Sequence, residues 1–191
     1  MARPKSEDKR NAILRAAIEV IAERGLTATP TAAISRLAGV AEGTLFTYFK
    51  TKDVLVNELY LTIKREQAAT CMGGLPAEAD VREQLRHVWD VYVDWGVAHP
   101  ATRKAMAQLQ VSGVLTAESL SAGLAPFARL QASIRTAIAQ DRLRPLPEPF
   151  VEAVMQSLAE TTMAAVSGKP EAAADYRRWG FEVLWNGIEQ R

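Results

Sequence analysis

The spacing of apolar residues constrains the fold of this chain more than any other feature of its sequence. Throughout the 191 residues, apolar side chains recur every three or four positions, whereas strand-like alternation is scarce. Glycines and prolines interrupt this helical pattern at short intervals. No apolar run approaches the roughly 18 residues that a membrane-spanning helix needs. The pattern predicts an all-α protein with no membrane partner.

The interruptions predict about nine helices. A first helix is expected over 8–24, and a second begins with Thr29 as its N-cap and Pro30 in its first turn. A short third helix is expected within 41–50, and a long fourth helix begins near Asp53. Later helices are expected at 80–98, 101–112, 126–143, 148–167 and 171–189, with a break or kink at Pro126 where the pattern could extend over 117–140. The expected architecture is a three-helix head, residues 1–52, and a larger helical bundle, residues 53–191.

The charge distribution separates the same two parts. Residues 1–52 hold nine lysines and arginines against five acids, whereas residues 53–191 hold fourteen against seventeen. A basic head on an acidic body is typical of a protein whose head meets a polyanion. The single cysteine, Cys71, cannot form an internal disulfide, and the N-terminus lacks the apolar segment of a secretory signal. These features predict a cytoplasmic protein.

The segment around Gly39 has the properties of a helix-turn-helix. Ser35 is small enough for two helices to cross closely, and Gly39 can adopt the positive φ that the turn needs. Apolar residues that would hold the pair onto the first helix are Ile34, Ala38, Val40 and Leu45. The second helix of such a motif can lie in the major groove of DNA, with its first residues against base edges.

From Gly25 to Leu55, the sequence resembles the DNA-binding head of the tetracycline-repressor (TetR) family of transcriptional regulators. The signature of that family is met by Gly39, Val40, Ala41, Gly43, Thr44, Leu45, Phe46, Tyr48, Phe49 and Lys52. The resembling head covers about the first quarter of the chain. The chain length, the number of helices and the long fourth helix are also similar to that family.

The resemblance implies a set of contacts with double-stranded operator DNA. The implied DNA-binding residues are Arg3, Lys5, Thr29, Glu42, Gly43, Thr44, Thr47, Tyr48 and Lys52. Arg10 would join Arg3 and Lys5 in a basic arm, and Leu45 and Phe49 would belong to the core of the head. Ala41 departs from the usual serine cap, and Phe46 lacks a hydroxyl group. Glu42 would be repelled by phosphates unless it accepts a hydrogen bond from a cytosine amino group.

The resemblance also implies an effector pocket and a homodimer interface in the larger bundle. Candidate pocket residues are Trp89, Tyr92, Trp95, His99, Met106, Leu109, Phe127, Met155 and Met163. They would form an apolar, adaptable cavity for a small apolar or amphipathic effector of unknown identity. Candidate dimer-interface residues are Val154, Ser157, Thr161, Gly180, Val183, Leu184 and Gly187, which are small or apolar and follow helical spacing.

The function expected from this resemblance is that of a ligand-responsive transcriptional regulator, usually a repressor, that binds a near-palindromic operator as a homodimer. No cofactor, metal or catalytic residue is expected. Two alternatives remain open. An all-α metal-dependent enzyme could use Glu83, His87, Asp90 and Asp94, which follow helical spacing, although a solvated charged face explains these four residues better. The other alternative is a non-DNA-binding adaptor on the same scaffold.

Overall fold

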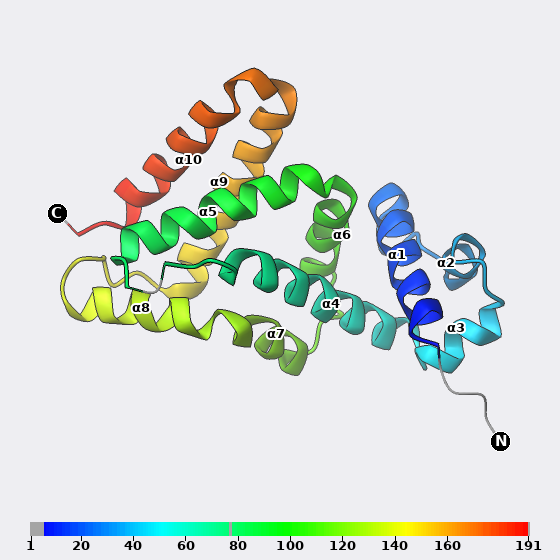
Figure 1. Ribbon diagram of the computed structural model, residues 1–191. Helices are drawn as coiled ribbons and strands as arrows, with labels where there is room; N and C mark the ends of the chain where they lie inside the picture. The colour runs from blue at the N-terminus through cyan, green and yellow to red at the C-terminus, as the bar shows by residue number, and fades with distance from the viewer. Residues whose placement is uncertain (1–5, 77, 191) are drawn as a thin grey trace. The chain divides into compact units, whose positions relative to one another are not determined.

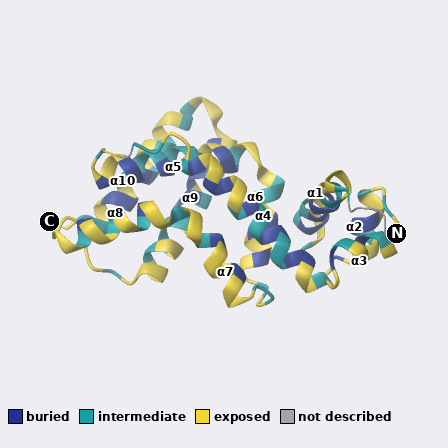
Figure 2. Cartoon of the chain, turned by 60° about the horizontal axis from the view of Figure 1, so that its bottom comes forward, coloured by how far each residue is buried: buried dark blue, intermediate teal, exposed yellow. Residues whose placement is uncertain are grey.

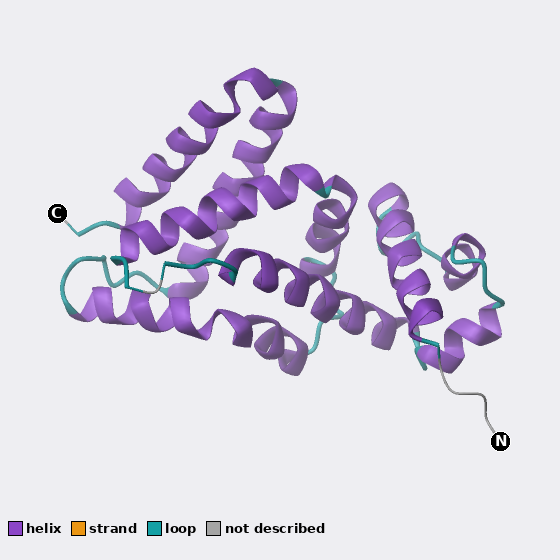
Figure 3. Ribbon diagram, viewed as in Figure 1, coloured by secondary structure: helices purple, strands orange, loops and turns teal. Residues whose placement is uncertain are grey.

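In the part of the chain that the structure describes, every regular element longer than a single bridge is a helix (Figure 3). The computed structural model describes residues 6–76 and 78–190, which contain ten α-helices, two short 3-10 helices and one isolated bridge between Leu143 and Glu189. The predicted all-α fold, with a helix-turn-helix head and a larger helical bundle, is confirmed. Within the described ranges, no helix combines the length and the apolar character needed to cross a membrane.

The helices follow the predicted order closely. They are α1 (Glu7–Arg24), α2 (Thr31–Leu37), α3 (Glu42–Tyr48), α4 (Lys52–Met72), α5 (Val81–Ala98), α6 (Pro100–Gln110), α7 (Ala117–Leu124), η1 (Ala125–Phe127), α8 (Ala128–Ala139), α9 (Glu148–Gly168), η2 (Pro170–Ala172) and α10 (Ala173–Ile188). The expected interruption at Pro126 is confirmed, because the 3-10 turn η1 separates α7 from α8. This break is why the described chain has ten α-helices where about nine were expected.

One of the two compact units of the chain contains the three head helices. It comprises the described part of residues 1–65 together with 99–124, and therefore also α6, α7 and most of α4. Helix α1 packs against both α2 and α6, and α2 packs against α3 (Figure 1). The core of this unit includes Ile13, Ile21, Leu45, Phe49 and Leu59, each at most 1% exposed. Because α6 joins the head, this compact unit extends well beyond the predicted boundary at residue 52.

The second unit comprises residues 66–98 and 125–191 and is built mainly from α5, α8, α9 and α10. Helix α9 packs against α5 and α10, and α5 also contacts α8 and α10. Figure 2 shows buried residues along one side of α5, α9 and α10 and exposed residues along the other. The core of the unit includes Trp89, Val93, Met163 and Phe181, which are at most 2% exposed.

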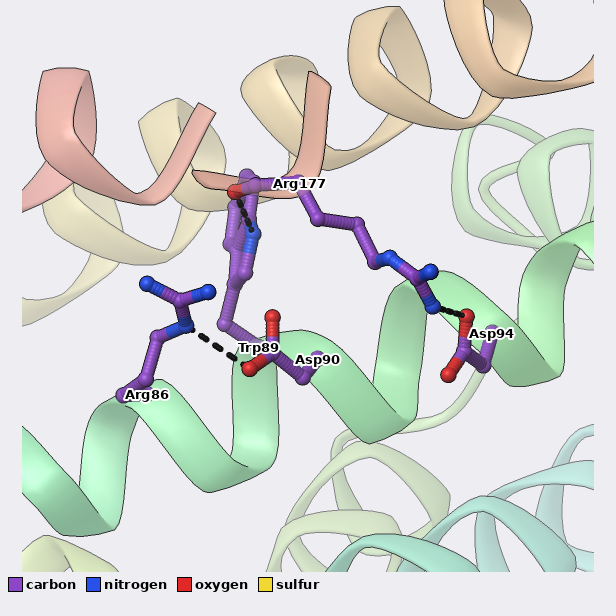
Figure 4. Close-up of polar contacts among 5 residues, drawn as sticks. All are labelled: Arg86, Trp89, Asp90, Asp94 and Arg177. Atoms are coloured by element: carbon purple, nitrogen blue, oxygen red, sulfur yellow. Dashed lines mark hydrogen bonds and ion pairs between the residues drawn. The ribbon is translucent and has the colours of Figure 1, made fainter. Parts of the chain in front are cut away.

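Close approach and polar contacts join α5 to α10 within this unit. A Cβ atom added to Gly180 would lie 2.6 Å from Cζ2 of Trp89, so these helices meet at a position where only glycine leaves enough room. The indole N–H of Trp89 donates a hydrogen bond of 2.9 Å to the carbonyl oxygen of Arg177, and the Arg177 guanidinium forms an ion pair with Asp94 (Figure 4). Gly180 is therefore a packing residue of the protomer.

Candidate nucleic-acid interface

The turn between α2 and α3 has the geometry that the sequence predicted. Gly39 has a φ of +67°, in the left-handed region that glycine adopts without strain. The amide of Val40 donates to the carbonyl oxygen of Ser35 at 3.0 Å, which closes the turn. Ser35 is 3% exposed and its hydroxyl donates to the carbonyl oxygen of Thr31 at 2.8 Å. The small side chain of Ser35, whose hydroxyl is hydrogen-bonded within α2, therefore lies where the two helices approach each other.

Helix α3 has one face in the core and the other in solvent. Leu45 and Phe49 are buried and anchor the helix, whereas Glu42, Gly43, Phe46 and Thr47 are exposed and Thr44 is partly exposed. Ala41 is the N-cap residue and provides no side-chain hydrogen bond, as expected from its methyl side chain. The exposed face begins at the first turn of the helix, where a recognition helix meets base edges.

Gly43 leaves the first turn of α3 without a projecting side chain. A Cβ atom at this position would have no atom of the described chain within 4 Å, so the glycine is not required by internal packing. Another surface could therefore approach the α3 backbone more closely than any larger residue at position 43 would allow.

Two polar residues of α3 already have partners in the chain. The Thr47 hydroxyl donates to the carbonyl oxygen of Gly43 at 2.9 Å. The amide of Ser6 donates to the Tyr48 hydroxyl oxygen at 2.8 Å, which ties the start of α1 to the end of α3. Both side chains reach the surface, but Tyr48 also has a structural role that the sequence did not indicate.

Thr29 does not play the capping role predicted for it. Helix α2 begins at Thr31, with Pro30 as the N-cap residue. The Thr29 side chain is 1% exposed, and its hydroxyl donates to the carbonyl oxygen of Gly25 at 2.7 Å. The N-cap prediction is therefore wrong, and the hydroxyl is committed to the protein interior. The hydrogen bond from the Thr29 hydroxyl to Gly25, four residues earlier, closes a turn after α1. The hydroxyl therefore does not cap α2.

A hollow of about 660 Å³ opens beside Thr29 and is lined by residues from three segments of the head. These residues are Thr27, Ala28, Thr29, Pro30, Thr31, Phe46, Lys50, Thr51 and Lys52. Lys52 donates from Nζ to the carbonyl oxygen of Leu26 at 2.9 Å, so it braces the segment that precedes α2. Of the two lysines, Lys50 is the more exposed. The sequence analysis did not single out Thr27, Thr31 or Lys50, although Thr27 and Thr31 each lie two residues from Thr29.

Of the three residues of the predicted basic arm, the structure describes only Arg10. Arg3 and Lys5 lie outside the described residues. Arg10 lies within α1, where its guanidinium forms a 2.6 Å ion pair with Glu58 and stacks over the ring of Phe49 at 5.7 Å from the centroid. Its assignment to an arm is wrong, because Arg10 is part of a helix and its charge is paired with Glu58 of α4.

The predicted pocket residues do not all belong to one compact unit. Trp89, Tyr92, Trp95, Phe127, Met155 and Met163 lie in the second unit, and all except Trp95 belong to its core cluster or pack against it. His99, Met106 and Leu109 belong to the first unit, because the chain enters α6 at Pro100 and α6 packs against α1. His99 is exposed at the N-cap of α6, while Met106 and Leu109 are buried. The prediction that all nine residues line one cavity of the larger bundle therefore needs this correction.

Some of the predicted dimer residues pack within their own chain, and the others are exposed. Leu184 is 3% exposed, and a Cβ atom at Gly180 would collide with Thr162 and Trp89, so both residues face the core of their own chain. The burial of Leu184 contradicts its assignment to a dimer interface, whereas Gly180 is partly exposed and packs within its own chain. Of the other predicted interface residues, Val154 is partly exposed, and Ser157, Thr161, Val183 and Gly187 are exposed. Positions 180 and 184 form the inner edge of the predicted stripe, while 183 and 187 form its outer edge.

Three of the four residues of the metal hypothesis, His87, Asp90 and Asp94, are engaged in other contacts. Asp90 accepts from Nε of Arg86 at 2.7 Å, and Asp94 pairs with Arg177 (Figure 4). Nε2 of His87 lies 3.1 Å from the carbonyl oxygen of Gly73. Among the residues that the structure describes, no group of three or more histidine, cysteine, aspartate or glutamate side chains could hold a metal ion. These contacts favour the charged helix face over the metal site.

Sequence comparison matches this head to known regulators. Residues 13–59 match the family described as "Bacterial regulatory proteins, tetR family". The chain is 24% identical over 115 residues to the HTH-type transcriptional regulator YhgD of Bacillus subtilis, and 44% identical over 48 residues to the fatty acid metabolism regulator protein of the same organism. These alignments cover 60% and 25% of this chain, and the same shares of the two relatives.

Solved structures extend the likeness to nearly the whole chain. A Shewanella sp. PV-4 protein assigned to the tetR family of transcription regulators is 25% identical, with a TM-score of 0.85 over 96% of this chain and 99% of its own. A TetR family transcription regulator from Marinobacter aquaeolei VT8 is 22% identical, with a TM-score of 0.87 over 97% of each chain. The transcriptional regulator FadR from Bacillus subtilis, solved in complex with stearoyl-CoA, is 19% identical, with a TM-score of 0.71 over 94% and 99% of the two chains. The likeness to the Marinobacter aquaeolei and Bacillus subtilis structures shows a shared fold.

The matched head, the positive-φ turn and the exposed face of α3 define a helix-turn-helix transcriptional regulator. Its helical second unit and the whole-chain likeness specify the class further. The chain belongs to the TetR family of transcriptional regulators.

Proposed function

We propose that this protein is a ligand-responsive repressor that binds a near-palindromic operator as a homodimer. The observation that carries the proposal is the exposed first turn of α3, where Gly43 leaves the helix backbone accessible while Leu45 and Phe49 hold the helix in the head core. Thr44 and Thr47 would meet base edges or phosphates from this face, and Lys50 and Lys52 would supply positive charge beside it. As a DNA-binding regulator it would act in the cytoplasm.

The dimer part of the proposal rests on the outer surfaces of α9 and α10. Ser157 and Thr161 present small exposed side chains on α9, and Trp179 and Val183 are 47% and 58% exposed on α10. Large apolar side chains exposed beside small ones are typical of helices that pack against a partner. A two-fold dimer would place its two recognition helices roughly 34 Å apart, one turn of DNA. This spacing is why the proposed operator is near-palindromic.

Replacing Gly187 by leucine should weaken the homodimer at least roughly tenfold, the effect of a modest loss of interface complementarity. No atom of the described chain lies within 4 Å of a Cβ at Gly187, so the leucine should be tolerated by the protomer fold. Analytical ultracentrifugation over a concentration series measures the dissociation constant. Ala107→Leu, on the exposed side of α6, is the matched control. An unchanged dimer in Gly187→Leu would remove this face from the interface.

The effector part of the proposal concerns the aromatic core of the second unit. FadR of Bacillus subtilis was solved with stearoyl-CoA, and a fatty acid metabolism regulator is 44% identical to this chain over 48 residues. We therefore propose an amphipathic effector with a long apolar part, such as an acyl thioester. A ligand held better by one arrangement of the helices would shift the population away from the DNA-binding state. Helix α4, which both units share, and α6, which packs on α1, are the elements that would transmit the change.

Selection of binding sites from a random duplex pool tests the function as a whole. We expect a near-palindrome whose affinity, measured by fluorescence anisotropy, falls steeply with salt because phosphate contacts release counterions. Addition of stearoyl-CoA at fixed operator concentration should then lower the anisotropy. If a folded dimer, refolded after removal of any bound ligand, enriches no sequence, the adaptor hypothesis replaces the repressor.

A further inference from the structure

Glu42 is the only acidic residue between Glu23 and Asp53, a stretch that holds four lysines and arginines. It is exposed and stands at the first position of α3, immediately before Gly43. A carboxylate on this turn would approach the phosphates of bound DNA and be repelled by them. An acid at such a position weakens binding to DNA in general unless a specific contact compensates for the repulsion.

The structure shows that Glu42 is held in place from the neighbouring helix. The hydroxyl of Thr31, at the start of α2, donates a hydrogen bond of 2.7 Å to Oε1 of Glu42. This bond links the first residues of the two helices of the motif and restricts the rotamers of a long, exposed side chain. It leaves Oε2 with no donor among the described residues. One carboxylate oxygen is therefore positioned by the protein, and the other can accept a hydrogen bond from outside.

The major groove offers few donors to such an oxygen. Cytosine presents only its N4 amino group there, whereas guanine presents the acceptors O6 and N7 and thymine presents the acceptor O4. Adenine presents an amino group next to the N7 acceptor, which a carboxylate also meets unfavourably. A fixed carboxylate thus attracts cytosine and repels the acceptor edges of the other bases.

We propose that Glu42, positioned by Thr31, reads the amino group of a cytosine in each half of the operator. This inference rests on the proposed function, because it assigns a base preference to a helix that must first lie in the groove. Glu42 contacts the base, and Thr31 acts through Glu42 as a positioning residue. The dimer symmetry would place the preferred cytosine at two symmetry-related positions of the near-palindrome.

The test compares operators selected by four proteins: the wild type, Glu42→Gln, Thr31→Val and Glu23→Gln. Glutamine has the shape of glutamate without its charge, and valine replaces the Thr31 hydroxyl by a methyl group. Glu23→Gln removes the same charge from an exposed position of α1 and is the control. Anisotropy on the selected duplex and on duplexes substituted at each position gives the discrimination by each protein.

We expect the wild type to prefer cytosine at one position per half-site by roughly tenfold to a hundredfold, as a specific base contact provides. Glu42→Gln should lose this preference while binding unrelated DNA more tightly, and Thr31→Val should reduce the preference at the same position only. Glu23→Gln should leave it unchanged. If Thr31 only stabilises the fold, Thr31→Val should weaken binding to all the substituted duplexes equally. It should then also lower the thermal stability of the protein, which thermal unfolding measures.

Three results would overturn the inference, and the third is distinguishable from the first two. If the wild type selects a near-palindrome that Glu42→Gln selects equally, or if the lost preference is for adenine, the assignment of Glu42 to cytosine is wrong while the repressor stands. If the wild type enriches no sequence, the proposed function fails and this inference fails with it.

Discussion

Gly43→Leu should weaken operator binding by on the order of a hundredfold, comparable to losing several base contacts, without lowering the thermal stability of the protein. The leucine would project from the first turn of α3, at the point where the helix backbone would approach the floor of the major groove. Within the described chain the new side chain has open space, because no atom lies within 4 Å of its Cβ. Leucine also has a better helix propensity than glycine, by up to about 1 kcal/mol.

The experiment combines anisotropy titration with thermal unfolding of the same preparations. Ala107→Leu is the matched control, since it adds a comparable side chain to an exposed position of another helix in the same compact unit. It should bind the operator as the wild type does. Retention of full operator affinity by Gly43→Leu would show that α3 does not enter the groove by its first turn. Loss of stability in Gly43→Leu would mean that position 43 is a packing position.

Gly180→Ala should destabilise the protein by about 2 kcal/mol, although alanine is the better helix former. The added methyl group would lie 2.6 Å from the Trp89 ring and would also collide with the hydroxyl of Thr162. Trp89 is 2% exposed and its indole N–H is bonded to the carbonyl oxygen of Arg177, so the ring cannot move aside without breaking that bond. Denaturant unfolding of the variant measures the loss.

A second glycine on the same helix provides the comparison. Gly187→Ala adds the same methyl group two turns later, where no other part of the described chain lies within 4 Å, so it should not destabilise the fold of the protomer. Gly180→Ala combined with Thr162→Ala should regain part of the lost stability, because one of the two colliding groups is removed. Equal stability of Gly180→Ala and Gly187→Ala would contradict the close approach of α10 to α5.

The helical pattern was readable from the sequence because it depends on local spacing. The ends of α1, the positive φ of Gly39 and the break at Pro126 all follow from backbone preferences of single residues. The exposed face of α3 was also predictable, since Leu45 and Phe49 mark the buried side of so short a helix. The start of α2 was misread because Thr29 has two competing uses, and the hydrogen bond to Gly25 is visible only in the folded chain.

Contacts that form only in the folded chain also explain why the predicted pocket residues, and the predicted dimer residues, do not all lie together. A helical wheel places Gly180, Val183, Leu184 and Gly187 on one stripe, but only the neighbouring helices determine which edge of that stripe is covered. His99 follows α5 in sequence yet belongs to the compact unit of the head, because α6 packs against α1. Side chains distant in sequence meet through packing, and periodicity carries no information about the partner of an apolar face.

By itself, the sequence determined the helical class, the order of the helices and the helix-turn-helix turn, because these depend on interactions between residues a few positions apart. Only the tertiary structure decided that Thr29 and Gly180 face the interior, that Arg10 is paired with Glu58, and that Thr31 holds Glu42. Each of these facts depends on a contact between two helices, or between a helix and the segment that leads to the next helix. Such contacts exist only once the chain has folded.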